Sequence, residues 1–307
     1  MSLNSTSHAR SPLRNNLLVN IKAHLASIWN TVLQISRDPI GALGLFLVTT
    51  IIFIAFFADF LMPYDPNQIN VLNRLADPTW EHWLGTDNLG RDSFSRVLIG
   101  TRVAMQVAIV SIGLAMVGGI VLGLISGYGP KWLDSLLVLI FDSMSSLPMI
   151  MFAMAVITVL GPGTYTLIIV IVSVSIPGYA RMIRAQTLSL KNSEFILAER
   201  SLNASSGRII FNHLLPNVVG SLVILASMDM PVVIMLEAGL SFLGLGIKPP
   251  DASWGTILND GYSFIRDSPV LIIAGGGPLI LATLGFTFLG ESLRDALDPK
   301  LKKRGSK

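Results

Sequence analysis

Six long apolar segments are the feature that most restricts what this chain can fold into. A helix of 22 residues, the length of the first segment, rises about 33 Å and can cross the roughly 30 Å hydrocarbon core of a bilayer. Charged residues make up only 13% of the chain, about half of their share in a soluble domain. The sequence therefore predicts an all-α polytopic membrane protein with six transmembrane helices: Ile40–Leu61, Val97–Ser126, Trp132–Leu160, Tyr165–Ile183, Pro216–Ala238 and Pro269–Gly290.

The distribution of Lys and Arg predicts the orientation of these helices. If the amino terminus is inside the cell, sixteen of the 22 basic residues fall in cytoplasmic segments, and six fall in the long external segments 62–103 and 240–269. Basic residues favour the cytoplasmic side of a membrane. Both termini are therefore expected in the cytoplasm, together with the segment that joins the fourth and fifth helices.

Polar stretches divide the chain into four parts. Residues 1–38 are expected to form a cytoplasmic segment, in which 16–36 makes an amphipathic helix on the membrane surface or against the chain's own helices. Residues 39–95 hold the first transmembrane helix and an external loop. Residues 96–292 hold the remaining five helices as one core, and 293–307 form a basic cytoplasmic tail.

Two patterns predict how the helices pack. Small residues fall four apart along the second helix and form a ridge that lets another helix approach closely: Ala115, Gly119, Gly123 and Gly127. Pro148 divides the third apolar segment and predicts a kink there.

A charged segment, EFILAERSLNASSGRIIFNHLLPN at 194–217, separates the fourth and fifth helices. Phe195, Ala198 and Leu202 predict an apolar helical stripe, which continues through Ile209, Ile210 and Leu214, with Glu194, Glu199, Arg200 and Arg208 on the opposite side. Asn tolerates a left-handed backbone, so Asn203, followed by Ser205 and Gly207, is expected to separate two short helices. Pro216 is expected to close the segment. Such an elbow is either a docking surface for a cytoplasmic partner or an ordinary loop.

The 194–217 segment resembles the coupling loop of the membrane subunits of ATP-binding-cassette (ABC) importers. That loop carries Glu-Ala-Ala, a Gly four residues after the second Ala, and Ile-x-Leu-Pro ten residues further on. Leu197-Ala198-Glu199, Asn203 and His213–Pro216 stand at these positions here, so the chain departs from the pattern. Four other stretches resemble more closely the C-type permeases of dipeptide, oligopeptide and nickel importers: LGTDNLGRDSFSRVLIGTR (84–102), SIPGYARMIRAQTLSL (175–190), LEAGLSFLGLGIKPPDASWG (236–255) and LRDALDPKLKK (293–303).

This resemblance implies the type I ABC importer membrane fold, in a bacterial inner membrane. It also implies four kinds of partner: a homologous second permease, two ATPases that bind ATP and Mg, a periplasmic or lipid-anchored solute-binding protein, and membrane lipid. ATPase-coupling roles are implied for Glu194, Ala198, Glu199, Arg200, Asn203, Ser205, Gly207 and Pro216. No residue distinguishes a peptide, glutathione-like or nickel-chelate cargo.

Ionisable residues inside apolar segments are costly and usually face protein or water. Asp142, Asp229 and Glu237, together with Met144 of a Met cluster, are candidates for lining a translocation path. A carboxylate there would attract the ammonium group of a peptide. The alternative is that neighbouring helices satisfy these groups, and this alternative is favoured for Glu237, which lies near the outer end of its helix.

The sequence carries none of the motifs that would make it an enzyme of a common kind. It has no G-x-x-x-x-G-K-[ST] phosphate loop, no G-x-S-x-G elbow and no H-E-x-x-H zinc helix. It has no Cys and only four scattered His, so no metal site, catalytic residue or bound cofactor is expected, and the basic residues beside the spans form no nucleic-acid-binding domain. Two rival functions remain: an ion-driven transporter or channel acting alone, for which the paired broken helices of inverted repeats are missing, and a membrane scaffold that carries nothing.

Overall fold

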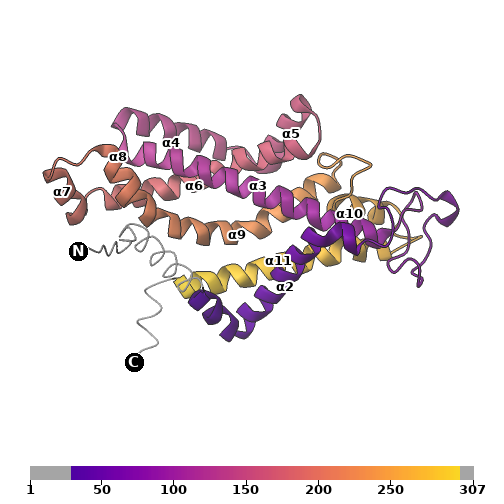
Figure 1. Ribbon diagram of the computed structural model, residues 1–307. Helices are drawn as coiled ribbons and strands as arrows, with labels where there is room; N and C mark the ends of the chain where they lie inside the picture. The colour runs from indigo at the N-terminus through magenta and orange to yellow at the C-terminus, as the bar shows by residue number, and fades with distance from the viewer. Residues whose placement is uncertain (1–28, 298–307) are drawn as a thin grey trace, which may run out of the picture.

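The computed structural model describes residues 29–297, and within that range the chain is helical, with no strand (Figure 1). Five helices are long and apolar enough to cross a membrane, and the number is six if the bent pair α4–α5 counts as one span. The predicted all-α polytopic fold is thereby confirmed. The long helices are α2 (Pro39–Leu61), α3 (Ser93–Tyr128), α4 (Lys131–Ser145), α5 (Met149–Leu160), α6 (Thr164–Leu190), α9 (Leu215–Phe242) and α11 (Val270–Leu297).

The shorter elements gather at the two ends of this bundle (Figure 1). One end, called here the α7 end, holds α7 (Glu194–Ser201), α8 (Ser206–Ile209) and the π-helical turn Ile210–Leu214. The opposite end, called the α10 end, holds α10 (Trp254–Ser263) and the loop of residues 62–92, which contains the short 3-10 helix Val71–Asn73. The whole bundle therefore separates two polar regions.

The ridge of small residues on α3 lies against α6, as predicted. A side chain at Gly119 would collide with Tyr179, and one at Gly123 would lie 2.6 Å from the carbonyl oxygen of Ala180. A side chain at Gly127 would come within 2.7 Å of the Thr187 Cβ. Glycine is needed at these positions because the two helix backbones touch, which makes α3 and α6 the rigid centre of the fold.

The third apolar segment breaks more sharply than a kink. Helices α4 and α5 meet at 91° across residues 146–148. Pro148 has no N–H to continue the ladder of α4, and two ion pairs hold α4 along α6. The Arg184 guanidinium donates to both carboxylate oxygens of Asp134 at 2.5 and 2.8 Å, and Arg181 pairs with Asp142 at 3.1 Å.

The terminal parts of the described chain pack against each other. Residues 29–37 are helical, and Ile35 is buried in a junction that Ser292 and Ala296 of α11 also line, whereas Trp29 is exposed. This part of the predicted amphipathic helix therefore packs one face on the chain itself. Residues 1–28 and 298–307, which hold the rest of that helix and most of the predicted basic tail, lie outside the described residues. The tail does not begin at 293, because α11 continues to Leu297.

Candidate coupling surface and transport path

The 194–217 segment forms the predicted elbow of two short helices. Helix α7 ends before Asn203, which takes a left-handed backbone with φ 60°. Ser205 then starts α8 by accepting a hydrogen bond from the Arg208 N–H at 3.4 Å. Pro216 does not close the segment: α8, the π-turn and α9 run on as one 37-residue unit, with Pro216 in the first turn of α9. The elbow is thus joined directly to a transmembrane helix.

The elbow is anchored by one side chain that the helical stripe did not identify. Ile196 is completely buried and packs in a cluster with Ile209 and Leu214 below it and Ile183 of α6 beside it. Phe195, Ala198 and Leu202 of the predicted apolar stripe are all exposed, Phe195 to 45% and Leu202 to 80%. In α7 the stripe is therefore an exposed face, and the buried residue lies one position away from it. Because α7 has only about two turns and buries one side chain, the apolar periodicity cannot identify which residue is buried.

Charged side chains of α7 reach toward the chain itself. The Glu199 carboxylate lies 3.4 Å from His213 Nε2 and 4.0 Å from Arg208 Nε. The Arg200 guanidinium lies over the Tyr128 ring, 5.6 Å from its centre. Glu199 and Arg200, predicted to lie opposite the apolar stripe, thus tie α7 to the π-turn and to the end of α3. No local pattern in the sequence identifies His213 or Tyr128 as their partners.

The elbow exposes large apolar side chains beside its charged ones. Phe195, Leu197, Leu202 and Phe211 are exposed, as are Glu194, Arg200, Gly207 and Arg208. Large apolar side chains gathered on an exposed polar element commonly mark a protein interface. We call these four apolar residues the elbow patch.

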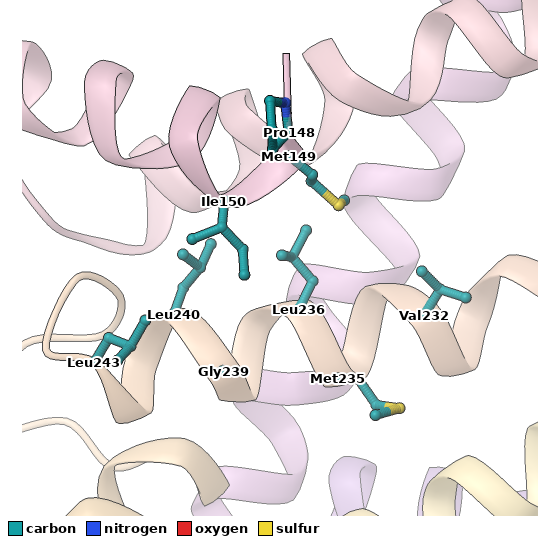
Figure 2. Close-up of a pocket in the computed structure, with 9 residues that line it drawn as sticks. All are labelled: Pro148, Met149, Ile150, Val232, Met235, Leu236, Gly239, Leu240 and Leu243. Atoms are coloured by element: carbon teal, nitrogen blue, oxygen red, sulfur yellow. The ribbon is translucent and has the colours of Figure 1, made fainter. Parts of the chain in front are cut away.

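An apolar cavity of about 460 Å³ opens where α5 begins, between α5 and α9 (Figure 2). Met149 and Ile150 point toward Leu236 and Leu240 of α9 in this view. Its lining contains no charged side chain: Pro148, Met149, Ile150, Val232, Met235, Leu236, Gly239, Leu240 and Leu243. The cavity offers contact to apolar groups and no fixed charge.

The predicted path residues fall in three different settings, and none of them lines this cavity. Asp142 has Arg181 as its counter-ion on α6, and Met144 lies partly exposed half a turn further along α4. Glu237 is completely buried and accepts a hydrogen bond from Ser241 Oγ at 2.8 Å. Asp229, half-buried on α9, faces the Tyr179 hydroxyl of α6. Only Asp229 has neither a cationic partner nor complete burial.

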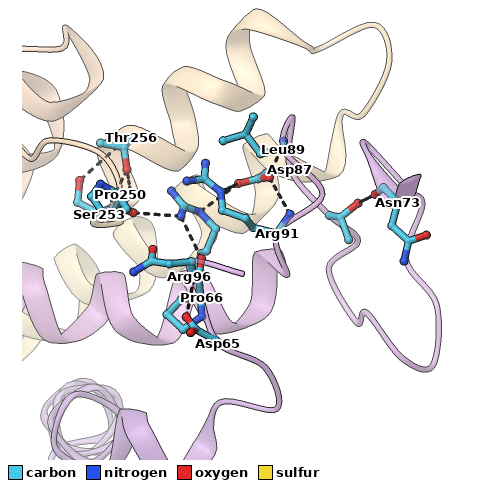
Figure 3. Close-up of polar contacts among 12 residues, drawn as sticks. Asp65, Pro66, Asn73, Asp87, Leu89, Arg91, Arg96, Pro250, Ser253 and Thr256 are labelled. Atoms are coloured by element: carbon cyan, nitrogen blue, oxygen red, sulfur yellow. Dashed lines mark hydrogen bonds and ion pairs between the residues drawn. The ribbon is translucent and has the colours of Figure 1, made fainter. Parts of the chain in front are cut away.

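At the α10 end, a buried ionic network fixes the 62–92 loop (Figure 3). Asp87 accepts a hydrogen bond from Arg91 Nε at 2.6 Å, and its carboxylate also lies 3.3 Å from Arg96 Nε. Asp92 caps α3 by accepting the Ser95 N–H at 2.7 Å. Gly90 has φ 73°, and a side chain there would collide with the Asn70 carbonyl. The motif at 84–102 therefore builds a rigid turn on the first turns of α3.

The same network reaches the second loop of this end. Arg96 donates to the carbonyl oxygens of Pro66 at 3.2 Å and Pro250 at 3.4 Å (Figure 3). Buried Trp254 of α10 donates to the Val97 carbonyl at 3.4 Å. Burial raises the pKa of the Asp260 carboxyl, and the nearby Arg96 opposes this rise. The 84–102 and 236–255 stretches thus contact each other, and both stretches stabilise the structure of this end.

No group of three or more His, Cys, Asp or Glu in residues 29–297 is placed to hold a metal ion. Within the described residues, an elbow at one end, a rigid cap at the other and long apolar helices between them make this a multi-span helical membrane protein. Residues 119–303 match the family described as binding-protein-dependent transport system inner membrane component, and the chain belongs to this family. Residues 27–78 match the N-terminal TM domain of oligopeptide transport permease C.

Relatives of similar length support this assignment. The chain is 39% identical to the dipeptide transport system permease protein DppC of Alkalihalophilus pseudofirmus, over 88% of both chains. It is 42% identical to the glutathione transport system permease protein GsiD of Pectobacterium atrosepticum, over 85% of this chain and 87% of that one. It is 35% identical to the oligopeptide transport system permease protein OppC of Bacillus subtilis, over 90% and 91%.

A solved structure shares the fold. A chain of the MetNI methionine ABC transporter in an inward-facing conformation superposes with a TM-score of 0.54 at 19% identity, over 66% of this chain and 97% of that one. The protein is thus a multi-span permease component of an ABC importer in a bacterial inner membrane.

Proposed function

We propose that this chain forms half of the translocation path of an ATP-driven importer of dipeptides or oligopeptides, and that its elbow couples the path to ATPase subunits. The cargo class is supported by the relatives, which are named for dipeptide, oligopeptide and glutathione transport. The coupling role is carried by one observation: the elbow patch is exposed while Ile196, in the same short helix, is fully buried. A helix built in this way has one face for a partner and one for the membrane domain.

The proposed assembly contains this chain, a homologous second permease, two ATPases and a periplasmic or lipid-anchored solute-binding protein. ATP and Mg are bound by the ATPases and not by this chain. The α7 end is assigned to the cytoplasm, because basic residues favour that side of a membrane and Lys131, Lys191, Arg200 and Arg208 lie in the segments at this end. The α10 end then faces the solute-binding protein.

Coupling requires a rigid element whose position differs between two states. In this proposal, closure of the ATPase pair on ATP displaces α7 through the elbow patch. Ile196 passes the displacement to α6 and α9, and the Arg200–Tyr128 contact passes it to α3. The path opens outward to receive the peptide and returns inward after hydrolysis.

The proposed path wall includes the α5–α9 cavity, whose carbon-lined surface suits a wide range of peptide side chains. Asp229 is the carboxylate that we propose attracts the peptide's ammonium group. Asp142 and Glu237 are less suited, because one already has a counter-ion and the other is buried. Met144 lies beside the α4–α5 break and would contact cargo only if that break opens.

The test is reconstitution of the four membrane and ATPase subunits in proteoliposomes with the solute-binding protein. We expect ATP hydrolysis that rises with peptide-loaded binding protein, and peptide uptake that requires ATP. Replacement of Phe195 and Leu202 by Ser is expected to release the ATPases, with Ile265→Ser as a control at an exposed apolar residue just after α10. Uptake by this chain alone would favour the ion-driven transporter, and neither uptake nor ATPase association would favour the scaffold.

A further inference from the structure

The 62–92 loop exposes an unusual amount of apolar surface for a loop that is held so rigidly. Leu72 and Trp80 are 97% and 96% exposed, and Ile69, Val71 and Trp83 are more than half exposed. The Asp87 network and the close approach of Gly90 to the Asn70 carbonyl hold the backbone of the loop that carries them. Large apolar patches on a rigid support mark interaction sites.

The position of the loop along α3 excludes lipid as the partner. Arg102 of α3 forms an ion pair with Asp59, at 2.8 Å, near the end of α2. The exposed Phe60 next to Asp59 is among the last apolar residues of that helix. Because a charged pair is costly in hydrocarbon, we place the boundary of the hydrocarbon core at this level. The Trp83 ring contacts Phe94, with 4.9 Å between the ring centres, and Phe94 lies eight residues before Arg102, which is about 12 Å further along the helix. A headgroup layer is only roughly 5–7 Å thick, so this surface stands in water.

A polar groove of about 240 Å³ runs beside these side chains, and its character is acidic. Asp65 and Glu81 line it together with Tyr64 and His82. Its walls are flanked along the chain by the exposed apolar residues, with Ile69 and Leu72 next to one wall and Trp80 and Trp83 next to the other. The groove has room for one long basic side chain of a partner.

The exposed charges of the loop are also mainly acidic. Within residues 62–92, Asp65, Asp77 and Glu81 are exposed, and Arg74 is the exposed base. Arg74 is engaged within the chain, since its guanidinium lies 5.5 Å from the centre of the Phe264 ring. A matching partner surface is therefore apolar with Lys or Arg at its edge.

We infer that the 62–92 loop is a docking surface for the importer's solute-binding protein, which inserts a basic side chain between Asp65 and Glu81 and packs apolar residues on Leu72 and Trp80. This inference rests on the proposed function, because that function places a soluble protein at the α10 end. It adds which surface of this chain holds that protein and which chemistry the protein must present.

The test uses the assembled complex in nanodiscs and the peptide-loaded solute-binding protein, with the dissociation constant measured by surface immobilisation. Combined replacement of Leu72 and Trp80 by Ser is expected to raise this constant at least tenfold. ATP hydrolysis without the binding protein is expected to stay unchanged. The backbone at Trp80 is kept in this variant, so its carbonyl still accepts the Trp83 indole N–H, at 3.1 Å in the native chain. Trp132→Ser is the matched control, since Trp132 is also exposed but lies at the α7 end.

The charge component is tested separately with Glu81→Lys. We expect weaker binding and a smaller dependence of the dissociation constant on salt, because an attractive pair is lost. Unchanged binding in both variants overturns the inference. So does loss of the second permease from the complex, which would make the loop a permease–permease interface. If even the unaltered complex fails to bind the solute-binding protein, the proposed function is what has failed.

Discussion

The two polar regions of this molecule are built in opposite ways. At the α10 end, buried charges hold the chain: Asp87, Arg91 and Arg96 are all at most 6% exposed. At the α7 end, the elbow has a single buried anchor, Ile196, and its ion pairs are partly exposed. One region is fixed by its own interior, whereas the other leaves an apolar face uncovered.

This difference indicates that the α10 end is rigid and that the elbow can move. A region held by buried ion pairs loses several kcal/mol if those pairs break, so it keeps one shape. A short helix with one anchor and exposed ion pairs shifts at small cost, since exposed pairs contribute only about 0–1 kcal/mol. The π-turn between α8 and α9 fits this interpretation, because π-helical turns are frequent at functional sites. The comparison predicts unequal effects of mutation at the two ends.

The largest effect is expected for Asp87→Asn. This change leaves Arg91 and Arg96 buried without their shared anion, which costs about 3–5 kcal/mol. The thermal unfolding midpoint of the detergent-solubilised protein should fall steeply, and the 62–92 loop should become open to protease. Asp77→Asn, an exposed carboxylate of the same loop, should leave both measurements unchanged. Equal effects of the two changes would mean that the network does not hold the loop.

Ile196→Ala is expected to have the next largest effect, about 2–4 kcal/mol locally, because it removes the buried anchor of α7. The ATPases should still bind through the elbow patch, so ATP hydrolysis should persist while peptide uptake falls. Leu197→Ala is the matched control at the neighbouring exposed position, and it should weaken ATPase binding instead. If both variants lose the ATPases, anchor and patch are not separate functions.

A smaller effect on folding is expected for Glu199→Lys, which repels Arg208 and loses the pair with His213. Because the pair is partly exposed, stability should change by about 1 kcal/mol or less. Peptide uptake per ATP hydrolysed should nevertheless fall, since α7 loses its link to the base of α9. Glu291→Lys, a change at an exposed carboxylate of α11 outside the elbow, controls for the added charge. Normal coupling in Glu199→Lys would contradict the role given to this link.

The features that sequence alone could predict are those carried by local chemistry or by long repetition. Six apolar segments, the small-residue ridge on α3 and the left-handed Asn203 belong to this kind. Pro148 marked the place of the break between α4 and α5 but not its 91° angle. The position of α4 also involves the pairing of Asp134 with Arg184 of α6, fifty positions apart in the chain, which no local pattern shows.

The candidate site was less predictable because it depends on which residues meet. Ile196 lay one position from the predicted stripe, and the partners of Glu199 and Arg200 come from the π-turn and from α3. The acidic and basic residues of LGTDNLGRD were visible in the sequence, yet the burial that makes Asp87 an ion-pair centre appears only when the loop folds onto α3.

The smallest effect tests whether every charge at the α10 end stabilises it. Burial raises the pKa of Asp260 above its ordinary value near 3.8, although Arg96 opposes the rise. The folded state therefore binds this proton more tightly than the unfolded state, and the ionised carboxylate is a small cost at neutral pH. Asp260→Asn should increase the free energy of unfolding at pH 7.5 by no more than about 0.5 kcal/mol, which would be seen as a slightly higher unfolding midpoint.

The pH dependence gives this prediction its sign. As pH falls through the raised pKa, the native carboxyl takes up its proton and the advantage of the Asn variant should shrink, until it vanishes below about 3.8. A variant that is less stable than the native chain at pH 7.5 would show instead that attraction to Arg96 outweighs burial. Asp260 would then, like Asp87, stabilise the α10 end, and the difference in stability between this end and the elbow would be larger.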